Sequence, residues 1–430
     1  MTGRRHPSSP RPRHRRLLCA AAAGVSLLTG CGVLPGDPGD SREPLTVMTW
    51  APEGTAGPAT VNMAGMPAMA DAYARWINRR GGIDGHELRV ITCDEGDTSL
   101  GAANCARQAV DHRVVAVVGS YSGHGRAFMA PLEAAGIPYI GGYGASGEEF
   151  TSYLSYPVNG GQSALLAGNG KQLARVCERV SLVRPDTVGG DGLAALLNTG
   201  LAEAHRPASA DIKAPEDATS YEEPAATALR RAPGGCVTAV LGERTETFFD
   251  SFRRLGPEGA GVRISSVLGS VGQPLIDRTG GRDSPFEGAY LTGWYPESGD
   301  PRWDAMRQVI QGYAFGDDRI DPDDTGVQTT WIAYTALKAV VEALDEPRIT
   351  AGRVATALNR GTEVDTGGLT PVLRWGFGDL LGSSAYPRIV NRHVTFQIVR
   401  DGRLVAQRKG FVDVTETLSD ARLSDARPAG

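Results

Sequence analysis

The stretch AYARWINRRGGIDGHELRVITCDEGDTSLGAANCARQAVDHRVVAVVGSYSG, residues 72–123, decides the fold of this 430-residue chain. It opens inside a pattern of apolar side chains at helical spacing, which a glycine pair ends. Residues 87–92 predict a strand, Thr98 or Ser99 can cap the helix that follows, and residues 114–120 predict a wholly apolar strand. Strands that are apolar on both faces and alternate with helices indicate a parallel sheet.

The same alternation continues on both sides of this stretch. Residues 45–50 predict a strand before it, and residues 137–142 predict a strand after it. The pattern restarts after Tyr156-Pro157, and the helices there alternate with strands at residues 181–183, 236–242 and 263–269. About 400 residues exceed the usual size of one hydrophobic core. We therefore expect an α/β protein built from two similar doubly wound units.

The C-terminal third adds a helix, a hairpin and a tail. Residues 327–344 place apolar side chains on one helical stripe, which is typical of core packing. A second helix is expected near Thr350, and residues 394–405 predict two strands joined by an Asp-Gly turn. The charged repeat near the end predicts a disordered tail over residues 416–430.

The N-terminus has the features of a lipoprotein leader. Six arginines precede the apolar run 17–28, which is too short for a membrane-spanning helix, and LLTGC then places small residues before Cys31. We expect residues 1–30 to be a signal peptide, Cys31 to carry the lipid, and residues 31–44 to be a flexible tether. The alternative is an apolar core strand that contains a cysteine. A partial twin-arginine pattern at residues 15–18 leaves the export route open.

Composition excludes several classes of protein. Without residues 1–30, which hold six of the 44 basic residues and none of the acidic ones, the formal net charge is -11. An acidic chain with scattered arginines argues against nucleic-acid binding. The chain has no CxxC pair and no two histidines at i, i+4 spacing, so we expect neither a metal nor another cofactor, and exposed histidines instead.

Four cysteines remain besides Cys31, an even number that permits two disulfides in an exported chain. Proximity in sequence favours Cys93 with Cys105 and Cys177 with Cys236.

The order of these motifs resembles the type I periplasmic solute-binding proteins of ABC transporters, of the branched-chain amino acid receptor kind. Residues 72–123 are similar to that family's helix, GGI-[ND]-G turn, second strand, acidic loop, alanine-rich helix and VVG strand. The resemblance continues with GIPYIGGYGAS (136–146), RPDTVGGDGLAALL (184–197) and VLGERTETFFDSFRRLG (240–256), so it covers nearly the whole mature chain. The order of these motifs along the chain is specific to that family.

The resemblance implies two lobes of doubly wound parallel sheet, a Venus flytrap, joined by three crossover strands. We place the crossings near Tyr156, Tyr290 and Leu369. The N-terminal lobe would then comprise residues 45–156 and 291–368, and the C-terminal lobe residues 157–290 and 369–415.

The strand order that the resemblance implies, 2-1-3-4-5, brings Cys177 close to Cys236. For Cys93 and Cys105, free buried thiols are the alternative to a bridge that closes a short loop.

Ligand contacts are expected beyond the carboxyl ends of the strands. In the first lobe, the resemblance and the presence of glycines and hydroxyls point to the loops 120–124 and 143–146. The residues expected to bind the ligand there are Ser120, Tyr121, Ser122, Gly123, Tyr143, Gly144, Ala145 and Ser146. Trp50 could wall the pocket, or it could be a packing residue, and the serines could be turn formers.

The second lobe departs from the amino acid receptors, because an aromatic residue is missing before the glycines of its first loop. Asp191, Glu243, Arg244 and Ser270 could face the cleft, or their charges could simply be solvated.

Two functions from different classes remain. The first is a monomeric, lipid-anchored binding protein outside the cell membrane, which captures a small polar solute such as an amino acid, an amide or a short carboxylate for an ABC permease. A receptor that senses the solute without transport is a variant of it. The second is a cell-surface hydrolase, but GSYSGHG (119–125) and GASGE (144–148) both fail the G-x-S-x-G pattern.

Overall fold

A computed structural model describes residues 42–54, 61–216, 218–256 and 261–419 of the protein. Its first parallel sheet has strand β1 (Leu45–Ala51) between two neighbouring strands. The other strands of this first sheet are β2 (Leu88–Asp94), β3 (Ala116–Val118), β4 (Tyr139–Ile140) and β5 (Ser155–Tyr156). Their order is β2-β1-β3-β4-β5. This confirms the order 2-1-3-4-5 that the family resemblance implied.

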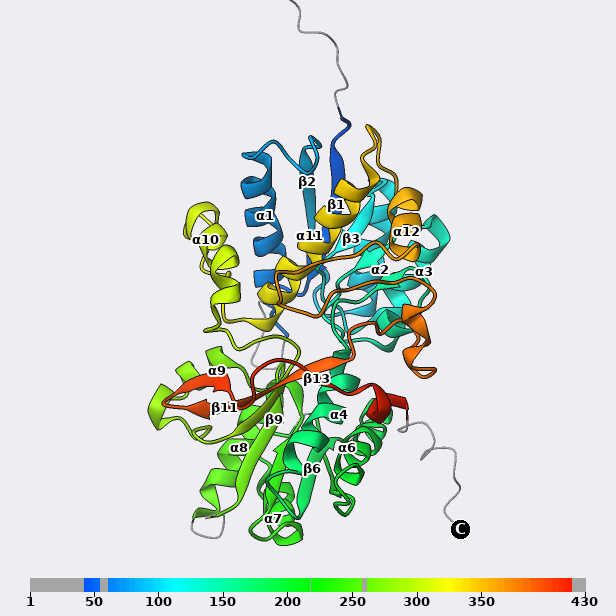
Figure 1. The fold of residues 1–430 in the computed structure, drawn as a ribbon. Helices are drawn as coiled ribbons and strands as arrows, with labels where there is room; N and C mark the ends of the chain where they lie inside the picture. The colour runs from blue at the N-terminus through cyan, green and yellow to red at the C-terminus, as the bar shows by residue number, and fades with distance from the viewer. Residues whose placement is uncertain (1–41, 55–60, 217, 257–260, 420–430) are drawn as a thin grey trace, which may run out of the picture. The chain divides into compact units, whose positions relative to one another are not determined.

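Helices cover both faces of the first sheet and together with it form the first lobe (Figure 1). They are α1 (Gly65–Asn78), α2 (Ser99–Asp111), α3 (Gly125–Ala135), η1 (Gly147–Phe150), η5 (Pro301–Trp303), α10 (Asp304–Tyr313), α11 (Thr325–Leu344) and α12 (Ala351–Asn359). Val47 belongs to the core shared with α1 and α11, whereas Met48 and Trp50 belong to the core shared with α2 and α3. Covered faces on both sides explain why β1 and β3 are largely apolar on both faces.

The second sheet has the order β12-β11-β10-β9-β8-β6-β7, with β13 paired to β11. Its strands are β6 (Val180–Pro185), β7 (Ala210–Ala214), β8 (Cys236–Ala239), β9 (Arg263–Val267), β10 (Tyr290–Gly293), β11 (His393–Arg400), β12 (Arg403–Ala406) and β13 (Val412–Asp413). From β6 to β10 the pairing is parallel and repeats the order 2-1-3-4-5, and β11 then joins antiparallel. The predicted hairpin is confirmed, with Asp401 and Gly402 both at positive φ in its turn.

The second sheet and its helices form the second lobe. The helices are α4 (Gly161–Leu173), α5 (Val188–Asp191), α6 (Leu193–Ala202), α7 (Glu222–Arg231), η2 (Gly242–Arg244), α8 (Thr245–Arg254), α9 (Gln273–Arg278) and η4 (Gly281–Asp283). Helices α4 and α6 pack on one side of the sheet and α7 and α8 on the other. The two doubly wound lobes confirm the predicted fold class.

The chain passes between the lobes where a strand of one sheet is followed by an element of the other. It leaves the first sheet after β5 and enters α4, and it leaves β10 to build η5, α10, α11 and α12 of the first lobe. It returns through a long segment that contains η6 (Asp379–Gly382) and ends in β11. The exact residues at which the lobes divide stay a prediction.

Both predicted disulfides are present. Cys93 and Cys105 have their Cα atoms 5.8 Å apart, and those of Cys177 and Cys236 are 5.9 Å apart. The first bridge joins the end of β2 to α2, and the second joins the segment before β6 to the start of its neighbour β8. The alternative of free thiols at Cys93 and Cys105 is therefore wrong.

Several predictions concern the ends of the chain. The signal peptide 1–30 and Cys31 lie outside the described residues. At the end of the predicted tether, Glu43 donates its backbone N–H to the carbonyl oxygen of Pro347 at 3.0 Å. The predicted tail begins too early, because residues 415–419 are helical and Leu418 is buried. Among the described residues, no helix combines the length and apolar character needed to cross a membrane.

Candidate functional site

Loops that follow strands of both sheets meet around a cavity of about 230 Å³. The first lobe contributes Asn62, Met63, Tyr143, Asp324 and Thr325, and the second contributes Glu243, Glu246, Gly269, Ser270, Gly272, Pro274, Leu275 and Arg278. Parallel strands of a doubly wound sheet present their carboxyl ends at one edge, so loops after β4, β8 and β9 can reach a common site. A small molecule in this cavity would contact both lobes.

Tyr143 is the aromatic residue of the cavity. Its ring centroid lies 5.2 Å from that of Tyr121 and 5.3 Å from that of Trp294, which belongs to the segment after β10. A Cβ at Gly269 would lie 2.9 Å from the Tyr143 hydroxyl oxygen, and Gly269 has φ +93°. Glycine therefore allows the tyrosine of one lobe to approach the backbone of the other.

The cavity has more acidic than basic side chains. Glu243, Glu246 and Asp324 line it, and Arg278 is the one basic residue among its described lining residues. A guanidinium nitrogen of Arg278 lies 2.9 Å from a carboxylate oxygen of Glu246. Glu243 and Asp324 form no ion pair among the described residues, so three carboxylates face one guanidinium and the site has a net negative charge.

Burial raises the pKa of the two remaining carboxyls. Asp324 caps α11 by accepting the backbone N–H of Val327 at 3.0 Å. Desolvation raises the pKa of Asp324 to about 6 even though these backbone donors favour the ionised form. Desolvation also raises the pKa of Glu243, with nearby Arg278 opposing the rise. A cationic solute beside them would lower the pKa of both carboxyls, because an opposite charge favours their ionised form.

The serines of the loop after β3 hold the backbone in place. The hydroxyl of Ser120 accepts the N–H of Trp50 at 3.1 Å, and the hydroxyl of Ser122 accepts the N–H of His124 at 3.0 Å. Both serines are buried, whereas Gly123 is exposed. This supports the turn-forming role for the two serines, and of this loop Tyr121 comes nearest to the cavity, through Tyr143.

The loop after β4 is organised by Glu149. Its carboxylate accepts the N–H of Gly144 at 3.0 Å, and the N–H and hydroxyl of Ser146 at 2.9 and 3.1 Å. Burial outweighs these bonds and raises the pKa of Glu149 to about 7. Ser146 is thus engaged in a capping box, and Ala145 is exposed at the tip of the loop.

Trp50 lies in the core and not at the cavity. Its side chain is fully buried, with ring centroids 5.5 Å from Phe128 and 5.9 Å from Tyr139. Its indole nitrogen has no hydrogen-bond partner among the described residues. These contacts support the packing role that was the alternative to a pocket wall.

The second-lobe candidates divide into two groups. Glu243 and Ser270 line the cavity. Asp191 lies 2.9 Å from Arg184 and 3.2 Å from Lys213 in ion pairs, and Arg244 belongs to η2. Neither Asp191 nor Arg244 lines the cavity that the described residues form.

Sequence reasoning missed more than half of the lining. Asn62 and Asp324 come from segments far from any predicted ligand loop, and Arg278 lies at the end of a helix without a motif. One signal was available for Asp324, because an aspartate just before an apolar helical stripe is a typical N-cap.

Two doubly wound lobes with a cavity at the carboxyl ends of their strands define the class of two-lobed solute-binding proteins. This chain belongs to the periplasmic binding protein family, whose model matches residues 53–380. The match puts the chain among proteins that bind small solutes outside the cytoplasm, not among enzymes, which removes the hydrolase alternative. No protein of curated function matches the sequence.

Solved structures share the fold at low sequence identity. A substrate-binding periplasmic protein from Ralstonia solanacearum is 19% identical with a TM-score of 0.67, over 85% of this chain and 100% of that one. A possible leucine/isoleucine/valine-binding protein from Rhodopirellula baltica is 16% identical with a TM-score of 0.69, over 89% and 99%. A solute-binding protein of an ABC transporter from R. palustris, in complex with 4-hydroxybenzoate, is 14% identical with a TM-score of 0.69, over 86% and 97%.

Proposed function

We propose that this protein is a lipid-anchored receptor outside the cell membrane, which closes its lobes around a small polar solute carrying an amine and delivers it to an ABC permease. The observation that carries the proposal is the cavity of about 230 Å³ with lining from both lobes. A solute that contacts both lobes stabilises the closed arrangement over any open one, and a permease can distinguish the two by lobe geometry.

The charge of the cavity supports an amine. Glu243 and Asp324 offer carboxylates that form no ion pair among the described residues, and Tyr143 offers an aromatic ring that a cation can contact. Arg278 can hold a carboxylate at the other end of the solute. An amino acid or a related amine fits this arrangement better than a simple carboxylate does, because a lone anion would face the excess acidic charge.

The lipid anchor on Cys31 is part of the proposal. It is supported by the arginines, the short apolar run and the small residues before this cysteine. A monomer held at the membrane by one lipidated residue stays near its permease, and the glycine- and proline-rich segment after Cys31 gives it reach. Cys31→Ser should abolish lipid labelling and release the protein from the membrane fraction, and membrane retention of the unlabelled variant would contradict the anchor.

The solute can be identified on the protein itself. Small molecules released from the purified full-length chain would be identified by mass spectrometry, and these, together with amino acids, amides, amines and short carboxylates, would be tested by thermal shift and calorimetry. We expect amine-bearing solutes to raise the melting temperature. Glu243→Gln and Asp324→Asn should each weaken their binding roughly 10- to 100-fold, the loss of a charge-assisted hydrogen bond.

Glu222→Gln is the matched control, because Glu222 is an exposed residue at the start of α7 and does not line the cavity. Its affinity should equal that of the wild type. Binding of carboxylates without an amine, unaffected by Glu243→Gln, would contradict the choice of solute, and a panel without any stabilising molecule would contradict solute capture.

A further inference from the structure

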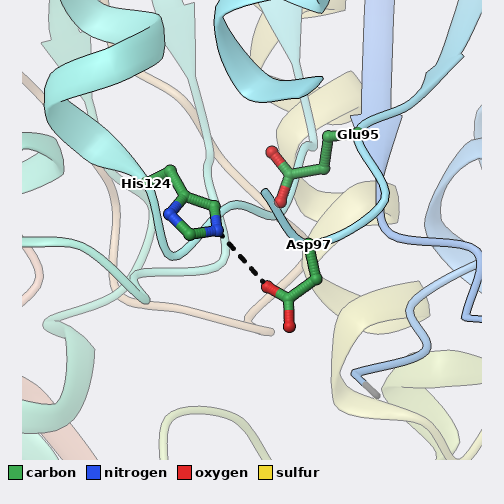
Figure 2. A group of neighbouring side chains, drawn as sticks. All are labelled: Glu95, Asp97 and His124. Carbon is green, nitrogen blue, oxygen red and sulfur yellow. Dashed lines mark ion pairs between the residues drawn. The ribbon is translucent and has the colours of Figure 1, made fainter. Parts of the chain in front are cut away.

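Three side chains with metal-binding atoms meet on the first lobe, outside the cavity. Glu95 and Asp97 lie in the loop between β2 and α2, and His124 lies just before α3. One donor atom from each residue lies within 4.8 Å of the other two. Figure 2 shows the two carboxylates and the imidazole turned toward a common space, with a ring nitrogen of His124 3.6 Å from Asp97.

Two of these side chains have buried polar atoms without a regular hydrogen bond among the described residues. Glu95 is 1% exposed, and neither of its carboxylate oxygens makes a hydrogen bond of regular geometry among the described residues, where the Ser122 hydroxyl is its one neighbouring donor side chain. The Nε2 atom of His124 is also buried without a hydrogen-bond partner in the described part of the chain. Buried polar atoms are nearly always satisfied, and an unpaired buried carboxylate is costly. A cation between the three side chains would satisfy all of them at once.

We propose that Glu95, Asp97 and His124 form a site for a zinc ion. An imidazole nitrogen favours zinc and its neighbours in the transition series over magnesium and calcium, which prefer oxygen ligands. Three protein ligands with a water molecule in the fourth position complete a tetrahedral zinc site.

The distances require small movements. Ligands about 2.0 Å from a tetrahedral zinc lie about 3.3 Å apart. The separation of 3.6 Å between Nε2 of His124 and a carboxylate oxygen of Asp97 is already close to that value. Glu95 must approach by up to about 1.5 Å, which rotation of its side chain can supply.

A neighbouring hydroxyl group can orient the imidazole of His124 for metal binding. Its Nδ1 atom lies 3.1 Å from the hydroxyl of Ser99. In the tautomer that donates this N–H to Ser99, Nε2 carries the lone pair that a metal needs, and zinc-binding histidines are commonly oriented in this way. The Asp97 side chain is 33% exposed, which gives an ion access from solvent. The disulfide Cys93–Cys105 closes the loop that carries both carboxylates.

The zinc site is separate from the solute cavity, since none of its three ligands lines that cavity in the described structure. It is nevertheless close, because His124 shares a loop with Tyr121, whose ring contacts Tyr143. Zinc binding and solute binding can therefore be measured independently, and failure of one leaves the other intact.

Calorimetry on the full-length chain in detergent, freed of metal by a chelator, tests the site. The wild type should bind one equivalent of Zn²⁺ with a Kd of about 1 µM or tighter. Glu95→Gln and His124→Gln should weaken binding at least 10-fold. Ser99→Ala should weaken it about 10-fold, as is typical when a metal-binding histidine loses the hydrogen bond that orients its ring. His112→Gln and Asp111→Asn, at exposed positions around the end of α2, are the matched controls and should bind as the wild type does.

Two further measurements keep the result interpretable. Thermal unfolding of the metal-free variants checks that they fold, and Glu95→Gln should do so because it removes an unpaired buried charge. X-ray absorption at the zinc edge should show an imidazole ligand that His124→Gln removes. The proposal is overturned if the wild type binds no zinc, if His124→Gln binds zinc equally well, or if calcium binds as tightly as zinc.

Discussion

Replacing Glu149 by glutamine should change how the stability of the protein depends on pH. Glu149 is buried and accepts hydrogen bonds from Gly144 and Ser146. These two residues belong to the loop after β4, which also places Tyr143 at the cavity. Glutamine has nearly the same shape but cannot ionise. The substitution therefore separates the ionisation of this side chain from its volume.

The magnitude follows from the pKa of the buried carboxyl. Burial raises the pKa of Glu149 from 4.5 to about 7. Between these values the folded state holds a proton that the unfolded state has lost, so the free energy of unfolding falls as the pH rises. At about 1.4 kcal/mol per pH unit, this window corresponds to a loss on the order of 3 kcal/mol from Glu149. The stabilisation is fully present below pH 4.5 and lost above about pH 7.

Urea unfolding of the wild type and of Glu149→Gln at several pH values between 4.5 and 7.5 would measure this effect. The wild type should lose stability relative to the variant as the pH rises. In the variant, the amide NH₂ group of glutamine lies opposite backbone N–H donors. This lowers the free energy of unfolding by about 1–3 kcal/mol at every pH. Glu148→Gln is the matched control, because the one ion pair of Glu148 within the described residues is with Arg126, whose side chain is 95% exposed. A difference between wild type and Glu149→Gln that stays constant with pH would refute the reasoning.

Three other predictions concern stability and are checked by urea or thermal unfolding. Replacing both Cys177 and Cys236 by alanine should lower the free energy of unfolding by about 4 kcal/mol on the chain-entropy model, because the bridge closes a loop with a sequence separation of 59. A loss under about 1 kcal/mol would contradict that model. Asn169→Ala should cost about 2–4 kcal/mol, because this fully buried amide bonds to hydroxyls of three strands of the second sheet, and a neutral result would show that water replaces it. Gly170→Ala should lower the free energy of unfolding by about 1–3 kcal/mol, because its Cβ would lie 2.1 Å from a carbonyl oxygen of α6. Gly352→Ala on α12, where a Cβ meets no atom within 4 Å, should raise that free energy by about 0.5–1 kcal/mol. Equal effects of the two substitutions would contradict the close packing at Gly170.

Much of the fold could be predicted because its strands are covered on both faces. The run VVAVVGS has no polar face, so only a sheet between two helical layers can bury it. Strand β7 and helix α7 were not predicted, since β7 is an edge strand with exposed polar residues and α7 has many charged residues. Both elements have weak sequence patterns and are stabilised by packing against neighbouring strands and helices. Sequence periodicity does not measure that packing.

The candidate site was harder to predict. Tyr143, Glu243 and Ser270 were found because they directly follow strands, where ligands bind in this kind of fold. The serines after β3 had the right position but a different task, because their hydroxyls satisfy backbone N–H groups. A hydroxyl in a glycine-rich loop can bond to a ligand or to its own backbone, and only the folded structure distinguishes the two.

By itself, the sequence determined the fold class, which depends on periodicity, and both cysteine pairs, which follow from proximity along the chain. The order of strands was implied by the family resemblance alone. Only the tertiary structure decided which charges share the cavity and that Glu95, Asp97 and His124 meet. Asp324 and Glu243 line one cavity from different lobes, and the three proposed metal ligands come from two loops. Packing between segments that are remote in sequence brings such side chains together, so their spacing along the chain does not predict that they meet.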